Sequence, residues 1–265
     1  MSMLEIRDLT KRFGGFTALS NINLKVGRGD TLGIIGPNGS GKTTLFNVIS
    51  GVYKPTKGNI FFDGIDCSAL PAHEIAKAGV SRTFQMLRIF KDMSCFENML
   101  VGYHQHITYG AVTAAIGLPA KYSNERQAKA EMMELLDFVG LADYAHMPAA
   151  EMSIGQQRLL ALGRAVAMKP KMLMLDEPAA GLSPINIDRL LDTVTALQQK
   201  FGLTVIVIEH VLKVVMNMCN RVAVLDHGQK IAEGSPAEVK EDPLVIEAYL
   251  GKEMGDDEIR SMLHA

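Results

Sequence analysis

The sequence is poor in cysteine, and this scarcity excludes one class of fold. Its three cysteines, Cys67, Cys95 and Cys219, are far apart in the chain and form no CxxC pair. Small secreted domains that rely on disulfides are dense in cysteine. We therefore expect no disulfide framework, and a reducing cytosol as the compartment.

Long apolar runs are also missing. The longest candidates, TLGII (31–35) and LTVIVI (203–208), are the length of a strand, whereas a membrane-spanning helix needs about 18 or more apolar residues. The N-terminal stretch MSMLEIRDLTKRF is charged too early for a signal peptide. We expect any membrane role to come through a partner.

The chain has little net charge. Its formal charge is -2 and its isoelectric point is about 6.4, so electrostatics give no reason to expect nucleic acid as the main partner. With 48% hydrophobic and 21% charged residues, the composition is that of a globular protein with a sizeable core. A length of 265 residues suits one large domain or two small ones.

Short apolar strands alternate with amphipathic helical patterns along the chain. Apolar residues recur with helical spacing at 132–139, 159–166, 187–194 and 211–218. The predicted strands are 3–7, 31–35, 59–62, 171–175, 204–208 and 221–225. This alternation predicts an α/β fold with a mostly parallel sheet.

Two regions depart from that alternation. The first 65 residues are rich in strands with DG and GG turns, which predicts an N-terminal antiparallel β subdomain. Residues 70–150 have mostly helical patterns and no comparable buried strand, which predicts an inserted α-helical subdomain. Residues 103–123 have no clean period, and the polar tail from Lys252 is expected to be peripheral.

A glycine-rich segment follows the predicted strand 31–35. It fits the pattern G-x-x-x-x-G-K-[ST] in the required strand–loop–helix context. Glycines allow backbone N–H groups to converge on phosphate at a helix start, Lys42 would reach the β- and γ-phosphates, and Thr43 would place its hydroxyl on Mg²⁺. The predicted phosphate-binding residues are Gly36, Pro37, Asn38, Gly39, Ser40, Gly41, Lys42, Thr43 and Thr44.

Two adjacent carboxylates, Asp176 and Glu177, end the apolar run KMLML. The carboxyl ends of parallel strands face the crevice where ligands bind. Asp176 is suited to hold Mg²⁺, directly or through water. Glu177 is suited to accept a proton from a water that attacks the γ-phosphate. The alternative is a pair of solvated acids that cap the next turn.

Three further residues interrupt apolar stretches. Gln85 follows VSRTF and is suited to position water or contact Mg²⁺, and His210 follows TVIVIE within reach of a γ-phosphate. Phe13, in KRFGG, is suited to stack on adenine. Taken singly, each is better explained by packing, but their order relative to the phosphate loop favours function.

The stretch MSIGQQR (152–158) has the spacing of a capped helix start. Ser153 and Gln156 match the two ends of a capping box, with Gly155 between them. The order of GPNGSGKT, Gln85, SIGQQ, LMLDE and His210 resembles the ABC-type ATPases. The resemblance implies that Ser153, Gly155 and Gln156 form the signature motif, which binds the γ-phosphate of a nucleotide held by a second subunit.

The sequence differs from the common pattern of that family at several positions. Met152 and Ile154 stand where the family has Leu and Gly, and Ala180 and Ser183 stand where it often has Ser and Asp. Ser183 is still expected to cap a helix, with Pro184 at its first position. The differences at Ala180 and Ser183 argue against charge-based crosstalk between subunits through the segment AAGLSP, which follows the carboxylate pair.

Several segments narrow the resemblance to the ATP-binding subunits of branched-chain amino acid importers. They are SIGQQR, RTFQMLRIF, LDEPAAGLSP, IEHVLKVVM and IAEGSPAEVKEDPLVIEAYLG. The likeness covers residues 4–251 and is shared in part by subunits for amides, urea and lipopolysaccharide. It implies one ABC ATPase domain (1–251) with a helical subdomain at about 86–168, and a tail at 252–265.

The same resemblance implies the chemistry and the partners. It implies that ATP and Mg²⁺ are bound, and that a second ATPase subunit, of the same chain or a sister chain, completes the site. It also implies transmembrane permease subunits, indirect action with a periplasmic solute-binding protein, and a peripheral location on the cytoplasmic face of the inner membrane. The stretch from Gln85 to Phe96 is expected to dock a permease loop, with local core packing as the alternative.

Two other classes fit less well. A soluble ABC ATPase that acts on DNA ends or ribosomes would need a long coiled coil or two cassettes in one chain, and neither is present in this sequence. A P-loop GTPase would need an NKxD motif, which is absent, and a P-loop kinase would need an acceptor site and a basic lid.

Overall fold

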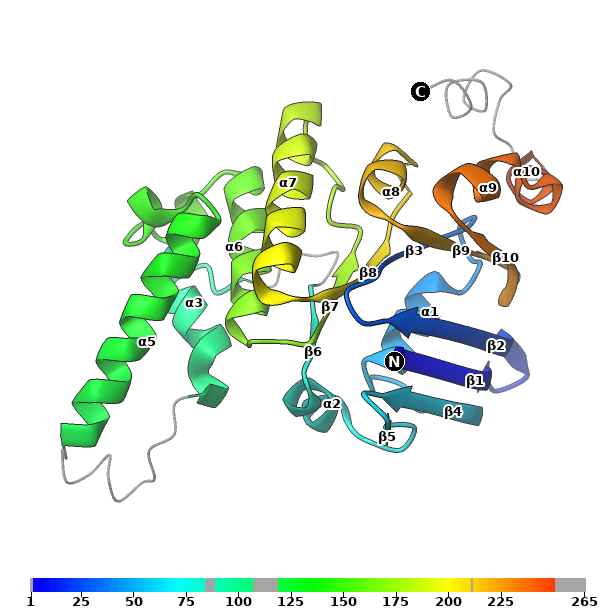
Figure 1. The fold of residues 1–265 in the computed structure, drawn as a ribbon, viewed down its shortest axis with the longest axis horizontal. Helices are drawn as coiled ribbons and strands as arrows, with labels where there is room; N and C mark the ends of the chain where they lie inside the picture. The colour runs from blue at the N-terminus through cyan, green and yellow to red at the C-terminus, as the bar shows by residue number, and fades with distance from the viewer. Residues whose placement is uncertain (1, 84–88, 107–118, 211, 251–265) are drawn as a thin grey trace.

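A computed structural model of the chain describes residues 2–83, 89–106, 119–210 and 212–250. Its strands form two sheets (Figure 1). The first sheet is antiparallel, in the order β2-β1-β4-β5. Its strands are β1 (Ser2–Phe13), β2 (Phe16–Gly27), β4 (Lys57–Phe62) and β5 (Ile65–Asp66). The predicted antiparallel unit at the N-terminus is therefore present as a separate sheet.

The second sheet has six strands in the order β10-β9-β3-β8-β7-β6. The strands from β9 to β6 are parallel, and β10 is antiparallel to β9. Their bounds are β3 (Thr31–Ile35), β6 (Val80–Arg82), β7 (Met172–Asp176), β8 (Thr204–Ile208), β9 (Arg221–Asp226) and β10 (Gln229–Gly234). The strands expected at 31–35 and 204–208 are confirmed to the residue.

Strand β6 corrects the expectation that residues 70–150 hold no strand of the core sheet. Val80 and Ser81 are buried and pair with Met172 and Leu173 of β7. Three residues are too few to show a periodic pattern, so this edge strand is recognisable only through its pairing with β7.

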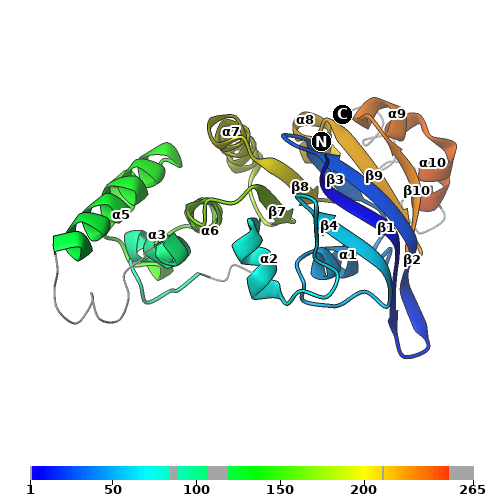
Figure 2. The same ribbon diagram turned by 60° about the horizontal axis from the view of Figure 1, so that its bottom comes forward.

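The helices fill both faces of the second sheet and form a projecting arm. Their bounds are α1 (Lys42–Ile49), α2 (Ala72–Ala78), α3 (Cys95–Tyr103), α5 (Pro119–Phe138), α6 (Ile154–Ala167), α7 (Pro184–Phe201), α8 (Leu212–Met218), α9 (Pro236–Glu241) and α10 (Pro243–Leu250), with 3₁₀ turns at His104–His106, Ala142–Tyr144 and Ala149–Glu151. Figures 1 and 2 show α3 and α5 standing away from both sheets. No helix among the described residues is long and apolar enough to cross a membrane.

Alternate residues of the parallel strands face two different cores. Leu32 and Ile34 of β3 pack with α1 and the antiparallel sheet, so that α1 lies between the two sheets. Leu173 and Leu175 of β7 pack on the other side with α6 and α7, in a core that continues into α3 and α5. Burial on both faces explains why these strands are continuously apolar.

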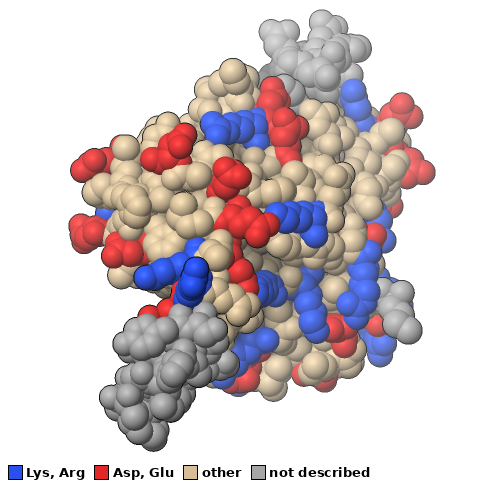
Figure 3. Space-filling model, turned by 60° about the vertical axis from the view of Figure 1, so that its left-hand side comes forward, with Lys and Arg blue, Asp and Glu red and all other residues tan. Residues whose placement is uncertain are grey.

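The start of α3 has a clear signal, since Ser94 caps it in a reciprocal hydrogen-bond pair with Glu97. The helical spacing predicted at 132–139 lies in the last turns of α5 and the residue after it, with Met132 and Leu136 buried. On the face drawn in Figure 3, acidic and basic side chains of the described residues are interspersed, so this side offers a partner charges of both signs.

Candidate nucleotide site

The loop after β3 requires glycine at two positions. Gly36 has φ 147°, and a Cβ there would lie 2.0 Å from the carbonyl oxygen of Leu225. Gly41 has φ 104° and is the N-cap of α1, and a Cβ there would lie 2.8 Å from the carbonyl oxygen of Ala18. These positions let the loop fold tightly at the start of α1, which is the geometry of a phosphate-binding loop.

Lys42 closes this loop on itself. The residue is 5% exposed, and its Nζ donates hydrogen bonds to the carbonyl oxygens of Gly36 (2.7 Å) and Pro37 (2.9 Å). Burial lowers the pKa of Lys42, and the charge of Glu177 opposes that shift. The ammonium is therefore held inside the loop, near the carboxylate that the sequence analysis assigned as general base.

The remaining loop residues differ in exposure. Asn38, Gly39 and Thr43 are exposed, whereas Pro37 and Ser40 are buried. The carbonyl of Ser40 accepts a hydrogen bond from the N–H of Gly228 (3.0 Å), which fixes the loop to the β9–β10 turn. The hydroxyl of Thr43, in the first turn of α1, is accessible to a ligand.

Tyr249 of α10 is a contact that the sequence analysis did not assign. The backbone of Gly36 hydrogen-bonds to its hydroxyl, and burial raises the pKa of Tyr249 to about 12. Helix α10 thus touches the first residue of the phosphate loop. The contact joins positions that are far apart in sequence, so no local pattern indicates it.

Asp176 ends β7 in a buried ion pair. Its Oδ2 lies 2.7 Å from Nη2 of Arg82 in β6, and both side chains are less than a tenth exposed. Arg82 also donates to Oδ1 of Asn47 in α1 (2.7 Å) and to Oγ of Ser50, the C-cap residue of α1 (3.0 Å). Arg82, which the sequence analysis did not assign, therefore joins the Asp176 carboxylate to the helix that follows the phosphate loop.

Glu177 has an unusual backbone conformation. Its φ is 47°, which few residues other than glycine adopt and which is common at functional sites. Its N–H donates to the carbonyl of Ile208 (2.9 Å). Its Oε1 lies 3.1 Å from Nε2 of His210, so two residues that were predicted separately are brought together.

Two more residues hold the loop that follows Glu177. The buried carboxylate of Glu209 accepts a hydrogen bond from the N–H of Ala179 (2.8 Å) and one from the N–H of His210 (3.0 Å). Arg158 of α6 donates to the carbonyl oxygens of Glu177 (3.4 Å) and Ala180 (2.8 Å). The helix that begins at Ser153 is thereby tied to the backbone of the carboxylate pair.

The predicted capping box at the start of α6 is confirmed. The Oγ of Ser153 accepts from the N–H of Gln156 (3.3 Å), and Oε1 of Gln156 accepts from the N–H of Ser153 (2.9 Å). Ser153 and Ile154 are exposed. The N–H groups of Ser153 and Gln156 are therefore both engaged within the capping box.

A small hollow of about 140 Å³ adjoins this entrance. It is lined by residues of α6, α7 and the loop before α7, and by none of the phosphate loop.

Ser183 is the N-cap of α7 with Pro184 in the first turn, but its side chain makes no capping hydrogen bond. The predicted helix start is therefore correct, whereas the hydrogen bond expected from the Ser183 side chain is not formed.

Phe13 lies at the end of β1, and its residue is 42% exposed. Its ring packs edge-on against Tyr53, with centroids 5.2 Å apart, and Nζ of Lys11 lies 4.8 Å from its centroid. These contacts leave ring surface accessible for a base. Gln85 lies outside the described residues.

Two oxygen-bearing side chains of the site are suitable ligands for magnesium. Mg²⁺ keeps several waters and takes one or two protein oxygens beside phosphate oxygens. Thr43 offers an accessible hydroxyl, and Asp176 offers a carboxylate at the end of β7. These two oxygen groups fit an ion that takes its remaining ligands from water and phosphate.

Sequence comparison places this geometry among known proteins. Residues 19–180 match the family described as ABC transporter, and residues 229–254 match the family described as branched-chain amino acid ATP-binding cassette transporter. The chain is 42% identical to the high-affinity branched-chain amino acid transport ATP-binding protein BraF of Pseudomonas aeruginosa, over 94% of this chain and 98% of BraF.

Solved structures agree in fold. The ADP conformation of MJ1267, an ATP-binding cassette of an ABC transporter, is 35% identical, with a TM-score of 0.83 over 95% of this chain and all of MJ1267. The dimeric structure of MJ0796, a bacterial ABC transporter cassette, is 26% identical, with a TM-score of 0.74 over 88% of this chain and 99% of MJ0796.

Proposed function

Because this chain belongs to the family of ABC transporter ATP-binding cassettes, we propose that it hydrolyses ATP to power an importer of branched-chain amino acids. The hydrolytic part rests on one observation, the 3.1 Å contact of Glu177 with His210 beside a phosphate loop that holds Lys42. The solute is supported by the likeness to BraF and by the match of residues 229–254.

ATP binding uses the phosphate loop. The converging N–H groups and the start of α1 attract the phosphates. Lys42 exchanges its hydrogen bonds with the carbonyl oxygens of Gly36 and Pro37 for stronger, charge-assisted bonds to phosphate oxygens. Phe13 and Tyr53 present aromatic surface for the adenine.

Hydrolysis uses Glu177 and His210. Water attacks the γ-phosphorus, the bond from that phosphorus to the ADP oxygen breaks, and Glu177 takes the proton of the water. The imidazole of His210 donates through Nε2 to the Glu177 carboxylate and orients it. Thr43 and Asp176 are the residues that would hold Mg²⁺, which neutralises charge on the phosphates when bound.

The exposed entrance at Ser153 serves a second subunit. Its positive helix end and capping hydroxyl face outward, as a site for an anion held by another molecule would. MJ0796, a similar cassette, is dimeric. Closure of two cassettes on ATP joins the phosphate loop of each to the Ser153 entrance of the other, and hydrolysis reopens them.

Permease docking uses a hollow of about 420 Å³ whose lining includes Thr83 and Phe90. Phe90 and Val101, both exposed, line it, and the guanidinium of Arg164 lies 5.4 Å from the centre of the Phe90 ring. Exposed apolar groups of this kind mark interaction surfaces. The stretch from Gln85 to Phe96, which was expected to dock a permease loop, is not exposed throughout, since Ile89 is buried. Docking at this surface would place the chain on the cytoplasmic face of the membrane.

Uptake by cells tests the proposed function. The gene is disrupted in its host, and uptake of labelled leucine, isoleucine and valine is measured. We expect uptake to fall and to be restored by the wild-type chain but not by Glu177→Gln. Normal uptake of all three amino acids, with loss of amide or urea uptake instead, would move the chain to a sister transporter class.

A further inference from the structure

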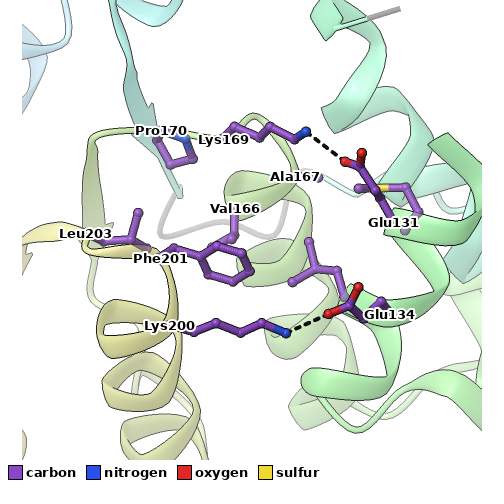
Figure 4. A pocket seen from close by; sticks show the side chains of 11 residues that line it. Glu131, Glu134, Val166, Ala167, Lys169, Pro170, Lys200, Phe201 and Leu203 are labelled. Atoms are coloured by element: carbon purple, nitrogen blue, oxygen red, sulfur yellow. Dashed lines mark hydrogen bonds and ion pairs between the residues drawn. The ribbon is translucent and has the colours of Figure 1, made fainter. Parts of the chain in front are cut away.

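A third hollow, of about 390 Å³, lies between the arm and the core (Figure 4). It is framed by α5, the end of α6 and the segment from the end of α7 into β8. Its volume lies within the range of small-molecule pockets. Its apolar walls come from Met132, Leu135, Val166, Ala167, Phe201 and Leu203.

Two ion pairs cross this hollow. Nζ of Lys169 lies 2.7 Å from Oε2 of Glu131, and Nζ of Lys200 lies 2.9 Å from Oε1 of Glu134. Both carboxylates belong to α5, and both ammonium groups belong to the facing side (Figure 4). The hollow therefore has an anionic wall, a cationic wall and an apolar lining, with the Phe201 ring between the two pairs.

We propose that this hollow binds a free α-amino acid with an aliphatic side chain, and that its occupancy slows ATP hydrolysis. The regulatory meaning rests on the proposed function, because this ligand is of the class that the importer would deliver. The ligand carboxylate would pair with Lys169 and Lys200, its ammonium group with Glu131 and Glu134, and its side chain with the apolar walls.

The existing ion pairs can be exchanged at little cost. The four side chains of these pairs are between 29% and 71% exposed, and ion pairs with this access to solvent contribute little to stability. A zwitterion replaces each pair by two new ones and also buries an aliphatic side chain. A ligand with only one charge forms only half of the new ion pairs, and a ligand without a side chain buries no aliphatic group.

The position of the hollow connects it to the nucleotide site. Lys169 lies just before β7, whose far end is Asp176, and Leu203 lies just before β8, which leads to His210. Val166 and Ala167 end α6, the helix that Ser153 begins. A ligand that holds α5 against these three elements restrains the arm relative to the sheet, and it would oppose the rearrangement that closes two cassettes on ATP.

Calorimetric titration of the purified full chain with L-leucine, without nucleotide, tests the site. We expect saturable binding, and at least about tenfold weaker binding of glycine, of leucinamide, which lacks the carboxylate, and of 4-methylpentanoate, which lacks the ammonium group. The absence of saturable leucine binding, or equal binding of glycine, would overturn the proposal.

Variants of the rim locate the binding. Lys200→Met and, as a second variant, Glu134→Gln at its largely exposed partner should each weaken leucine binding about tenfold. Lys77→Met is the matched control, because Lys77 forms a similar exposed pair with Glu74 on α2, at 2.9 Å. Thermal unfolding and ATP affinity of all three should equal those of wild type. Equal loss of leucine binding in Lys77→Met would refute the assignment.

The regulatory part has its own readout. Leucine should lower the ATP turnover of wild type and have less effect on Lys200→Met. Leucine binding without any change in turnover would overturn the regulatory part. Because binding is measured on the purified chain, its absence in a chain that still supports leucine uptake by cells would overturn only this site and leave the proposed function standing.

Discussion

The nucleotide site around the phosphate loop and the helix entrance at Ser153, both of which we propose to bind phosphate, hold their residues in different ways. At the first, Lys42 and Asp176 are almost fully buried, and Asp176 pairs with Arg82, 94 positions away in the sequence. At the second, Ser153 is exposed and bonds to Gln156, three positions away. One site is assembled by tertiary contacts, and the other forms within a single helical turn.

The difference follows from burial. A buried charge must find a partner inside the protein, and that partner can come from any element that packs against it. A helix start at the surface needs only its own side chains and water. The entrance can therefore be offered to another molecule, whereas the carboxylates and the Lys42 ammonium must be supported from within their own chain.

Glu177→Gln should give the largest effect, because it removes the proposed proton acceptor and leaves the buried frame intact. We expect turnover to fall by roughly 10²–10⁴-fold, with ATP affinity retained and an ATP-dependent dimer accumulating. Steady-state ATPase assays and size-exclusion chromatography with ATP measure this. Glu74→Gln, an exposed acid on α2, is the control and should behave as wild type. Near-normal turnover of Glu177→Gln would remove Glu177 from the role of base.

Arg82→Met should show how far the buried site depends on its partner. It leaves the Asp176 carboxylate buried without its cation, which we expect to lower the free energy of unfolding by about 3–5 kcal/mol. Lys171→Met is the control, because Lys171 pairs with Asp63 at the same 2.7 Å but is half exposed, and it should cost about 1 kcal/mol or less. If urea unfolding shows equal losses of stability in Arg82→Met and Lys171→Met, burial does not explain the strength of the Arg82–Asp176 pair.

Mixing two damaged chains tests whether the entrance acts in trans. Lys42→Ala should weaken ATP binding by roughly 10–100-fold, because charge-assisted bonds to the phosphates are lost. Ser153→Arg places a bulky side chain where the phosphate of the partner subunit would lie. Each homodimer then has two damaged sites, whereas the mixed dimer has one intact site, so ATPase activity should return to roughly a quarter of wild type in an equal mixture.

ATP-dependent dimerisation is measured beside turnover in the same mixture. Dimers that form without a gain in hydrolysis would indicate strict coupling of the two sites. If neither dimers nor activity return, the entrance serves only its own chain.

Ser153→Ala should have the smallest effect, on stability. The capping hydrogen bond to Gln156 is lost, and we expect a cost of about 1 kcal/mol. Ser183→Ala is the matched control, since Ser183 occupies the same N-cap position on α7 without a side-chain bond, and it should cost less than about 0.5 kcal/mol. Thermal unfolding measures the stability of the two variants. A greater loss of stability in Ser183→Ala than in Ser153→Ala would contradict the assignment of the stabilising capping bond to Ser153.

Local signals in the sequence were sufficient for much of the fold. The strands at 31–35 and 204–208 were predicted to the residue because they are buried on both faces and are continuously apolar. Strand β2 (Phe16–Gly27) lies in the region that the sequence predicts to be rich in strands, but no apolar run marks it as a separate element. The bond expected from Ser183 is absent, which shows that a capping residue at the right position does not guarantee the hydrogen bond.

By itself, the sequence determined the phosphate loop, the carboxylate pair and the capping box at Ser153, because each depends on residues a few positions apart. Only the tertiary structure placed Arg82 against Asp176, Glu177 against His210, and Arg158 against the loop after Glu177. These contacts join distant elements. Which residues meet in these contacts depends on which strands and helices pack together. Local patterns of hydrogen bonding in the sequence do not determine that packing.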